Sequence, residues 1–374
     1  MKKIKILFAI NCMNIGGAPS VVFNQMKYLD REKFEPHLLT LYPSKPANFF
    51  SQMDFLPKEH QKHFHLRRRS IFDLPTLIAI YRHLRVERFD VVYTHLFLAN
   101  FLVRGLAILA RVPTILAFEH STYFNKSAWQ VAMDRLLARF TKFIITSTQE
   151  VADFTAKMEN IPHEKFQVVR NPVSIPDRKN VDLDTLCEHA GIKEGDGPIF
   201  LTVGRFSDEK GQQVLVEALS KIKNDLRKAK FLLVGHGPKE AELDGLIGHH
   251  GLREAVRLIH DPVRAREYYH IADWFILPSL REGQAIVVEE AMLAGIPVIA
   301  SRIEGMGDIV SDGENGYTFP PGDAETLAER ISFVLAHPKE REKLAVSVRA
   351  DAQGFLSPRR RVEEFEKMVL FGTQ

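Results

Sequence analysis

The sequence predicts an α/β protein with two doubly wound domains. Short apolar runs alternate with helical stretches from end to end, which is typical of parallel sheets covered by helices on both faces. A polar, proline-containing segment divides these runs into two series. Glycine-rich turns follow several of the runs, where open α/β sheets bind ligands. The length of 374 residues is sufficient for two such domains.

The first series contains five expected strands. Its first run follows a basic head, as in a signal peptide, but no clear cleavage site comes after it, so we interpret it as a strand. The expected strands are 4–10, 37–42, 91–95, 114–119 and 142–147.

The second series begins after residue 195. Its expected strands are 199–203, 231–234, 256–259, 274–277 and 298–300. Between the two series, 171–197 contains prolines and clustered Asp and Lys, which indicate a linker and a short helix.

These signals predict four segments. They are a first domain at 1–175, a linker at 176–197, a second domain at 198–355 and a helix at 356–374. In the last segment, Val362, Phe365 and Val369 have the spacing of a packed helix face.

The charge distribution differs between the halves of the chain. Residues 1–180 contain 26 Lys and Arg against 15 Asp and Glu, a net charge of +11, and the remainder carries −8. The basic residues include the run 67–69 and Arg82, Arg85 and Arg88 on an expected helix at 73–88. They fit an anionic membrane surface, an anionic acceptor, or plain solvated charge. Without interleaved aromatics, they do not indicate nucleic-acid binding.

Cysteine usage and hydropathy indicate a cytoplasmic protein. Only Cys12 and Cys187 occur, which excludes a disulfide framework and fits a reducing compartment. No stretch approaches the about 20 apolar residues that cross a bilayer, so we expect any membrane contact to be peripheral, at the inner face of the plasma membrane.

Two acidic residues stand eight apart around a strand-to-helix turn. Glu282 follows an expected strand, Gly283 begins the turn, and Glu290 lies within the next helix. The N-terminus of such a helix attracts anions. Carboxylates beside an anion site suit a ligand with phosphates and hydroxyls, such as a nucleotide sugar. A solvated helix face is the alternative, and Glu289 fits it better than its neighbours do.

Three glycine turns follow expected strands. Arg205 and Lys210 flank a loop that begins at Gly204, and both cations can reach one anion there. The other two turns are Gly16-Gly17 and Gly235-His236-Gly237, and each is also explained as a tight structural turn.

An ordered set of motifs resembles the retaining family 4 glycosyltransferases, which have the GT-B fold of two Rossmann-like domains. The first half contributes weaker matches at 15–18, 94–96, His120 and 171–173. The second-half motifs are GRFSDEKG at 204–211, VGHGP at 234–238, PS at 278–279, a Glu pair at 282 and 290, EAMLAGIPVIAS at 290–301 and DGENGY at 312–317.

The resemblance implies a hexosyltransferase that moves a sugar, with retained configuration, from a nucleotide sugar to a hydroxyl of a glycan or lipid-linked acceptor. Cell-surface polysaccharide or glycolipid synthesis is the implied process. The first domain then binds the acceptor, the second binds the donor, and the helix at 356–374 crosses back to pack on the first domain. A UDP-sugar is the expected co-substrate, and no metal is expected because two cations stabilise the diphosphate.

Roles follow residue by residue from the resemblance. Arg205 and Lys210 neutralise the diphosphate, Glu282 binds the transferred sugar, and His120 faces that sugar across the cleft between the domains. His95 is assigned to the acceptor side. The donor-binding residues are Gly16, Gly17, Gly204, Gly235, Gly237, Gly283, Gln284, Ala285, Ile286 and Glu290, of which Glu290 binds the ribose.

Some positions depart from the family pattern. Gln284 and Ala285 predict an unusual sugar pocket, and the loop at 260–266, which reads the base in the family, is short. ADP or GDP therefore stays open as the nucleotide. Two other functions also stay open: a sugar-nucleotide 2-epimerase of the same fold, and a non-catalytic nucleotide-sugar-binding partner of another transferase.

Overall fold

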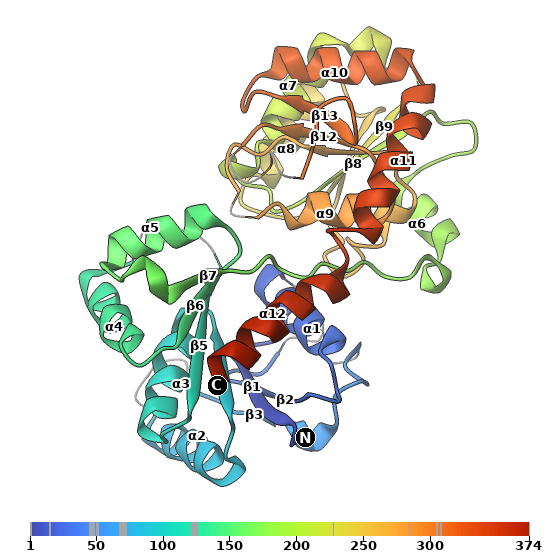
Figure 1. The fold of residues 1–374 in the computed structure, drawn as a ribbon. Coiled ribbons are helices and arrows are strands. Elements are labelled where there is room, and N and C mark those ends of the chain that lie inside the picture. Colours follow the sequence, from blue (N-terminus) through green and yellow to red (C-terminus); the bar gives the residue numbers. More distant parts are fainter. Residues whose placement is uncertain are drawn as a thin grey trace. The chain divides into compact units, whose positions relative to one another are not determined.

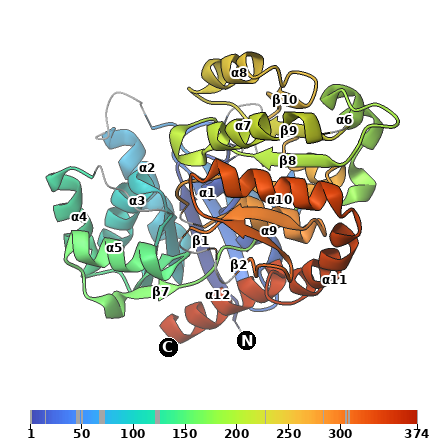
Figure 2. The ribbon, with the colours of Figure 1, turned by 90° about the horizontal axis from the view of Figure 1, so that it is seen from above.

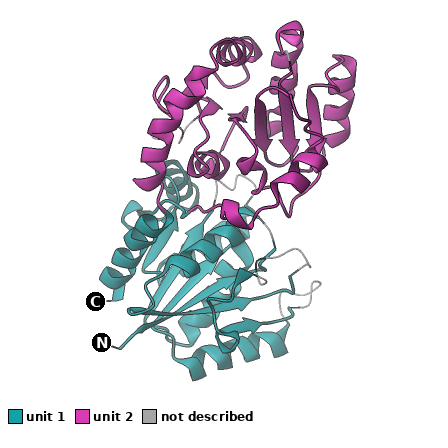
Figure 3. Ribbon diagram, turned by 90° about the vertical axis from the view of Figure 1, so that its right-hand side faces the viewer, with its two compact units in different colours: residues 1–172, 358–374 teal, residues 173–357 magenta. Residues whose placement is uncertain are grey.

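The structure, a computed structural model, describes residues 2–14, 16–44, 49, 52–66, 73–120, 126–226, 228–282, 284–303, 306 and 309–373. The chain divides into two compact units, which Figure 3 shows in different colours. Unit 1 comprises residues 1–172 and 358–374, and unit 2 comprises 173–357. Each is an open parallel sheet with helices on both faces, so the expected fold class is confirmed.

Unit 1 is built on a seven-stranded parallel sheet of order β3-β2-β1-β4-β5-β6-β7. The five expected strands are present, with ends shifted by up to three residues. The sequence did not predict β3 or β7, which are only three residues long and carry too few apolar residues to stand out. The strands are β1 (Ile4–Ile10), β2 (Phe34–Thr40), β3 (Gln61–His63), β4 (Val91–His95), β5 (Thr114–Glu119), β6 (Phe143–Thr146) and β7 (Phe166–Val168).

Helices cover both faces of this sheet (Figure 1). One face packs on α1 and α12, and the other packs on α2 and α3. The helices of unit 1 are α1 (Gly17–Tyr28), α2 (Leu74–Glu87), α3 (Phe97–Leu109), α4 (Ala128–Ala138), α5 (Gln149–Glu159) and α12 (Pro358–Thr373).

Unit 2 contains a six-stranded parallel sheet of order β10-β9-β8-β11-β12-β13. Figures 1 and 2 show α7 and α10 together on one face, and α9 with α11 on the other. Its elements are α6 (Leu183–Ala190), β8 (Ile199–Val203), α7 (Gln212–Lys221), β9 (Lys230–Val234), α8 (Glu240–His249), β10 (Val256–Ile259), β11 (Trp274–Leu277), α9 (Ile286–Leu293), β12 (Val298–Ser301), β13 (Gly316–Phe319), α10 (Ala324–Ala336) and α11 (Lys339–Gln353).

The segment expected to be a linker, 176–197, lies within unit 2 in the structure. It contains a 3-10 helix at Arg178–Asn180 and the helix α6. Leu186 and Ala190 of α6 are buried in a core cluster with Phe275. Because this apolar face packs on the sheet, the segment is part of the folded unit and not a free connection.

The order of the strands in each sheet determines where the candidate site lies. In unit 2, β8 pairs with β9 on one side and with β11 on the other, so the loops after β8 and β11 leave the sheet at its switch point. Open α/β sheets bind ligands at this position, beyond the carboxyl ends of the strands. In unit 1, the corresponding switch lies between β1 and β4.

No helix in the described part of the chain is both long enough and apolar enough to span a membrane. The last helix, α12, instead packs on the sheet of unit 1. Val362, Phe365 and Val369 are buried, and the ring of Phe365 stacks on Tyr93 with the ring centroids 5.1 Å apart. Arg361, also buried, donates a hydrogen bond to the carbonyl of Asn171 at 2.7 Å.

We expect Phe365→Ala to lower the free energy of unfolding by about 3 to 5 kcal/mol, because the variant loses a buried ring and leaves a cavity. Chemical denaturation followed by circular dichroism measures the loss. Phe371→Ala is the matched control, since Phe371 lies on the same helix but is 70% exposed. Equal stabilities of the two variants would contradict the packing of α12 on unit 1.

Candidate active site

Three loops interlock at the carboxyl ends of β8, β9 and β11. The amide of Phe206 donates to the carbonyl of His236 at 3.0 Å, and the amide of Leu280 donates to the carbonyl of Glu209 at 2.8 Å. These bonds join 204–211 to the loops on either side. The candidate site is therefore built on backbone contacts and not on free loops.

Glycines permit this close approach. A Cβ at Gly235 would overlap with the carbonyl oxygen of Gly204, and one at Gly237 would overlap with the backbone of Phe206. Gly211 has a φ of 62°, and its Cβ would overlap with the carbonyl of Pro278. Loop packing thus accounts for Gly235 and Gly237, and their contact with a donor stays a prediction.

Lys210 and Glu282 form an ion pair between two of these loops. The Lys210 ammonium lies 2.6 and 2.7 Å from the two carboxylate oxygens, and the Ser279 hydroxyl donates to the same carboxylate at 2.8 Å. The side chain of Glu282 is 9% exposed and that of Lys210 is 27% exposed. The structure thus joins two residues that the sequence analysis assigned to separate roles.

Arg205 lies in the same loop as Lys210, but its side chain is exposed. Its carbonyl accepts a hydrogen bond from the Gln212 amide at 2.9 Å, which fixes the backbone at this point. Within the described residues, its guanidinium makes no hydrogen bond or ion pair. Arg205 is therefore the cation of this loop that is available to an anion without breaking an existing pair.

Glu290 is buried in α9 and has two charged or polar partners. The Arg266 Nε atom lies 2.7 Å from one carboxylate oxygen, and the Tyr269 hydroxyl donates to the other at 2.9 Å. Burial and then the Glu290 carboxylate raise the pKa of Tyr269 well above its usual value, so its hydroxyl remains a donor. Neither partner was predicted from the sequence, although Arg266 stands at the end of the short loop 260–266 that was singled out there.

The expectation that Glu289 fits a solvated helix face is wrong. Its side chain is fully buried, and its carboxylate accepts a hydrogen bond from the Gln284 amide at 3.0 Å. The helix α9 is short and packs on α11 and the sheet, so neighbouring glutamates can both face inward.

The first turn of α9 begins at Ile286, after the buried residue Ala285. The side chain of Ala285 provides no cap, and the Ile286 amide bonds to the carbonyl of Gln284 at 2.8 Å. The side-chain amide of Gln284 donates to Glu289, and the contact of Gln284, Ala285 and Ile286 with a donor stays a prediction. Gly283, expected to bind the donor, lies outside the described residues.

In unit 1, Gly16 and Gly17 join β1 to α1. Among the described residues, apart from its chain neighbours and the backbone of α1, no atom lies within 4 Å of a Cβ built at Gly17. No close packing requires glycine at Gly17, and its contact with a donor stays a prediction.

His95 and His120 lie at the ends of β4 and β5. The Nδ1 atom of His95 is 3.3 Å from Nε2 of His120. Burial lowers the pKa of His120 to about 3, and it lowers the pKa of His95 well below its usual value. Both rings are thus neutral at neutral pH. His95 is fully buried, whereas His120 is only partly buried, so of the two rings His120 lies nearer the surface, and its contact with a ligand stays a prediction.

A buried charged cluster, absent from the sequence analysis, lies next to His120. It comprises three carboxylates and two cations: Glu119, Asp134, Glu159, Arg104 and Lys126. The Lys126 ammonium is 2.5 Å from Glu159, 3.0 Å from Asp134 and 3.5 Å from Glu119. Arg104 is 2.5 Å from Asp134. The cluster ties α3, α4 and α5 to the end of β5, where His120 follows.

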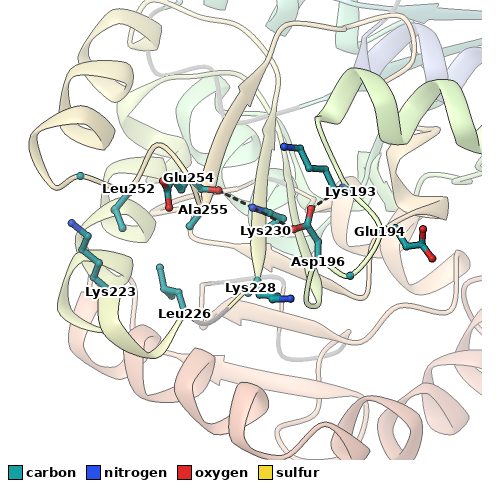
Figure 4. A pocket seen from close by; sticks show the side chains of 13 residues that line it. Lys193, Glu194, Asp196, Lys223, Leu226, Lys228, Lys230, Leu252, Glu254 and Ala255 are labelled. Carbon is teal, nitrogen blue, oxygen red and sulfur yellow. Dashed lines mark hydrogen bonds and ion pairs between the residues drawn. The ribbon is translucent and has the colours of Figure 1, made fainter.

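A hollow lies at the edge of the unit 2 sheet opposite to the candidate site, and Figure 4 shows the residues that line it. It has a volume of about 380 Å³ and is lined by segments that precede β8, β9 and β10. Lys230, one of its cations, is 3.6 Å from Asp196 and donates to the Glu254 carbonyl. This hollow is separate from the loops that carry Arg205 and Glu282.

The raised pKa of Glu159 makes the stability contributed by the buried charged cluster of unit 1 depend on pH. Burial and then the Glu119 carboxylate raise this pKa to about 7, against an ordinary value of 4.5. The folded state binds the proton more tightly than the unfolded chain does. The stability from this group is therefore complete below about pH 4.5 and is lost as the pH rises towards 7.

We expect the Glu159→Gln variant to lose less stability than the unmodified protein as the pH rises, because its amide keeps the side-chain shape but does not titrate. As the pH rises from about 4.5 to about 7.5, the melting temperature of the unmodified protein should fall relative to that of the variant. Thermal melts across this range measure the difference. Glu164→Gln, at an exposed site nearby, should parallel the unmodified protein. A constant difference between the unmodified protein and Glu159→Gln at every pH would contradict the assignment.

Family models match both halves of the chain. Residues 188–351 match the model described as glycosyl transferases group 1, and residues 15–175 match the model described as glycosyltransferase family 4. The two matches together cover the loops and the strand ends that carry the candidate site.

Curated relatives agree with these matches. An alpha-D-kanosaminyltransferase of Streptomyces kanamyceticus is 27% identical over 57% of this chain, and the match spans 56% of the relative. An uncharacterised glycosyltransferase of Methanocaldococcus jannaschii is 26% identical over 72% of each chain.

A solved structure extends the likeness over the whole chain. Anabaena HepE in complex with UDP and glucose superposes with a TM-score of 0.79 and 19% identity, covering 98% of this chain and 99% of that one. At this identity the likeness shows the fold, which is GT-B. The two family matches and the shared fold together show that the chain belongs to the family 4 glycosyltransferases.

Proposed function

We propose that this glycosyltransferase moves a hexose-type sugar from a UDP-sugar to a hydroxyl of a glycan or lipid-linked acceptor, with retained anomeric configuration. The observation that carries the proposal is the Lys210–Glu282 pair, which joins the loops after β8 and β11 at the switch point, with Arg205 exposed in the same loop. Two cations and a carboxylate at this edge suit a sugar diphosphate.

Negative charge that builds on the leaving diphosphate is the main demand of the reaction. Arg205 can bind a phosphate oxygen with its planar guanidinium, and Lys210 can turn one ammonium hydrogen towards the diphosphate while Glu282 holds the others. Glu282 thereby orients Lys210 and has lone pairs left for a sugar hydroxyl. We propose front-face attack, in which the leaving phosphate takes the proton of the acceptor hydroxyl.

The nucleotide would lie against Glu290. Its carboxylate is buried and held by Arg266 and Tyr269, so it is oriented in advance as an acceptor for ribose hydroxyls. The HepE structure holds UDP and glucose, which supports a UDP-sugar as the donor. Two cations at the diphosphate take the charge-stabilising role that Mg²⁺ has elsewhere, so we propose no metal at this site.

The acceptor would bind unit 1. His120 is a neutral imidazole there, able to donate or accept one hydrogen bond but not to supply a positive charge. We propose that it contacts the transferred sugar by a hydrogen bond. Synthesis of a cell-surface polysaccharide or glycolipid is the process that we propose.

We expect Arg205→Ala and Lys210→Ala each to reduce turnover by on the order of a hundredfold, the usual scale for losing one oriented charge stabiliser. Release of the nucleoside diphosphate in the presence of an acceptor measures turnover. Lys221→Ala is the control, because Lys221 pairs with Glu325 at the far end of α7. Near-normal rates for both loop variants would overturn the assignment of the diphosphate site.

The transfer assay also separates this function from the other two candidates. A thermal-shift screen of nucleotide sugars first identifies the donor, because a ligand of the folded state raises its stability. A 2-epimerase would convert that donor without an acceptor, and a non-catalytic partner would leave it unchanged. Formation of a glycosylated acceptor with retained configuration supports the proposed function.

We further propose that unit 1 contacts an anionic membrane through α2. Its outer surface exposes Leu74 and Ile78 together with Arg82 and Arg85. Apolar and basic side chains on one exposed helix face suit the surface of an anionic bilayer. The basic run 67–69 precedes this helix but lies outside the described residues.

Vesicles that contain anionic lipid should sediment the protein, and added salt should weaken the binding because each basic residue near the surface contributes about 1 kcal/mol. Arg82→Glu with Arg85→Glu should abolish most of the binding. The control is Arg253→Glu, at an exposed position of unit 2. Binding that ignores both ionic strength and the double substitution would contradict the role of α2.

A further inference from the structure

Two histidines and a glutamate meet at the edge of the unit 1 sheet, away from the candidate transfer site. Glu35 and His37 lie two residues apart on β2, so their side chains share one face of the strand. His60 ends a 3-10 helix immediately before β3. Because Gln61 of β3 pairs with Leu38 of β2, the parallel register brings His60 beside His37.

The three side chains offer nitrogen and oxygen atoms at close range. Nε2 of His37 is 2.8 Å from a carboxylate oxygen of Glu35, and Nε2 of His60 is 3.9 Å from the same oxygen. The two imidazole rings stack with centroids 3.9 Å apart. One potential ligand atom from each residue lies within 4.8 Å of the other two, so small shifts bring all three onto one ion.

The neighbouring charged groups leave the side chains of Glu35, His37 and His60 available to bind an ion. Lys5 lies 3.9 Å from Glu35, but its ammonium is bound at 2.6 Å by Glu87, which is its main partner. The Nδ1 atom of His60 is buried and has no hydrogen-bond partner within the described residues. No competing bond from that atom therefore holds the His60 ring away from Glu35 and His37.

We propose that Glu35, His37 and His60 form a binding site for a divalent transition-metal ion such as Zn²⁺. Two imidazoles and one carboxylate are a typical donor set for Zn²⁺ and its neighbours in the first transition row, whereas Mg²⁺ and Ca²⁺ prefer oxygen ligands alone. Water completes the coordination. The ion replaces the proton shared by His37 and Glu35.

The position of the site indicates a structural role. The edge strand β3 has three residues and pairs only with the last three residues of β2. An ion held by both β2 and the 3-10 helix would fasten the connection that leads into β3. Glu35 lies near the amino end of β2, whereas Gly16 and His120 follow the carboxyl ends of β1 and β5. The site therefore has no direct part in sugar transfer.

Cobalt binding tests the proposal, because Co²⁺ in a site with imidazole ligands absorbs visible light. The full-length protein, without a histidine tag, is freed of metal with a chelator, dialysed and titrated with Co²⁺, and Zn²⁺ is then added as a competitor. We expect one ion per chain, bleaching of the absorption by Zn²⁺, and a higher melting temperature with Zn²⁺ than without it.

Two conservative variants and one control complete the test. Glu35→Gln and His60→Gln should each weaken Co²⁺ binding at least about tenfold, because losing even a partner of a metal ligand typically costs about 10- to 100-fold in affinity. Both positions are partly exposed, and melts of the metal-free variants verify folding. His163→Gln, at an exposed position of unit 1, should bind as the unmodified protein does. Unchanged affinity in the two variants, or no saturable binding, would overturn the proposal. His37 and Glu35 would then be a hydrogen-bonded pair and not part of a metal site.

Discussion

Backbone contact between the loops after β8, β9 and β11 is the constraint on which the candidate site depends. Gly211, Gly235 and Gly237 let these loops lie closer than any side chain would permit. The contact fixes the backbone from which the side chains extend: Arg205 and Lys210 on one loop, and Glu282 on the next. A charged site held by the backbone reorganises little when charge develops, which is the condition under which electrostatic stabilisation is effective. The glycines thus support the chemistry without touching a substrate.

The two glutamates that stood out in the sequence have different electrostatic settings. Glu290 is nearly fully buried, and Arg266 and Tyr269 both bond to it, so its orientation is set before any ligand arrives. Glu282 is paired with the partly exposed Lys210, whose four-carbon stem can turn. The first arrangement suits a fixed acceptor of hydrogen bonds. The second suits a pair that adjusts as a diphosphate enters and leaves.

Much of the fold was predictable because its core strands are continuous apolar runs. All ten strands expected from such runs are present, whereas β3, β7 and β13 were missed. The first two are three residues long, and β13 carries glycine, tyrosine and threonine, so none of them has a strong apolar signal. The pairing of Lys210 with Glu282 across 72 residues was also beyond the sequence, because residue types show that both are charged but not that they meet.

The burial of Glu289 is another feature that could not be predicted from the sequence. A glutamate on a short helix is usually solvated, and only the packing of α9 between α11 and the sheet reverses that expectation. Arg266 and Tyr269 were missed for a related reason: nothing in an isolated loop identifies which carboxylate its arginine will meet. Patterns of apolar residues specify elements, whereas the partners of buried polar groups depend on tertiary contacts that a single sequence does not display.

The buried cluster in unit 1 also changes the meaning of the charge count. The net charge of +11 in residues 1–180 treats every ionisable group as if it contributed equally to the surface. Arg104 and Lys126 are buried, but so are Glu119, Asp134 and Glu159, and this set carries one more negative than positive charge when ionised. Because this set is withdrawn from solvent, the outer surface of this half carries a net charge slightly more positive than the +11 counted. The internal network therefore does not weaken the attraction that this half exerts on an anionic surface or acceptor.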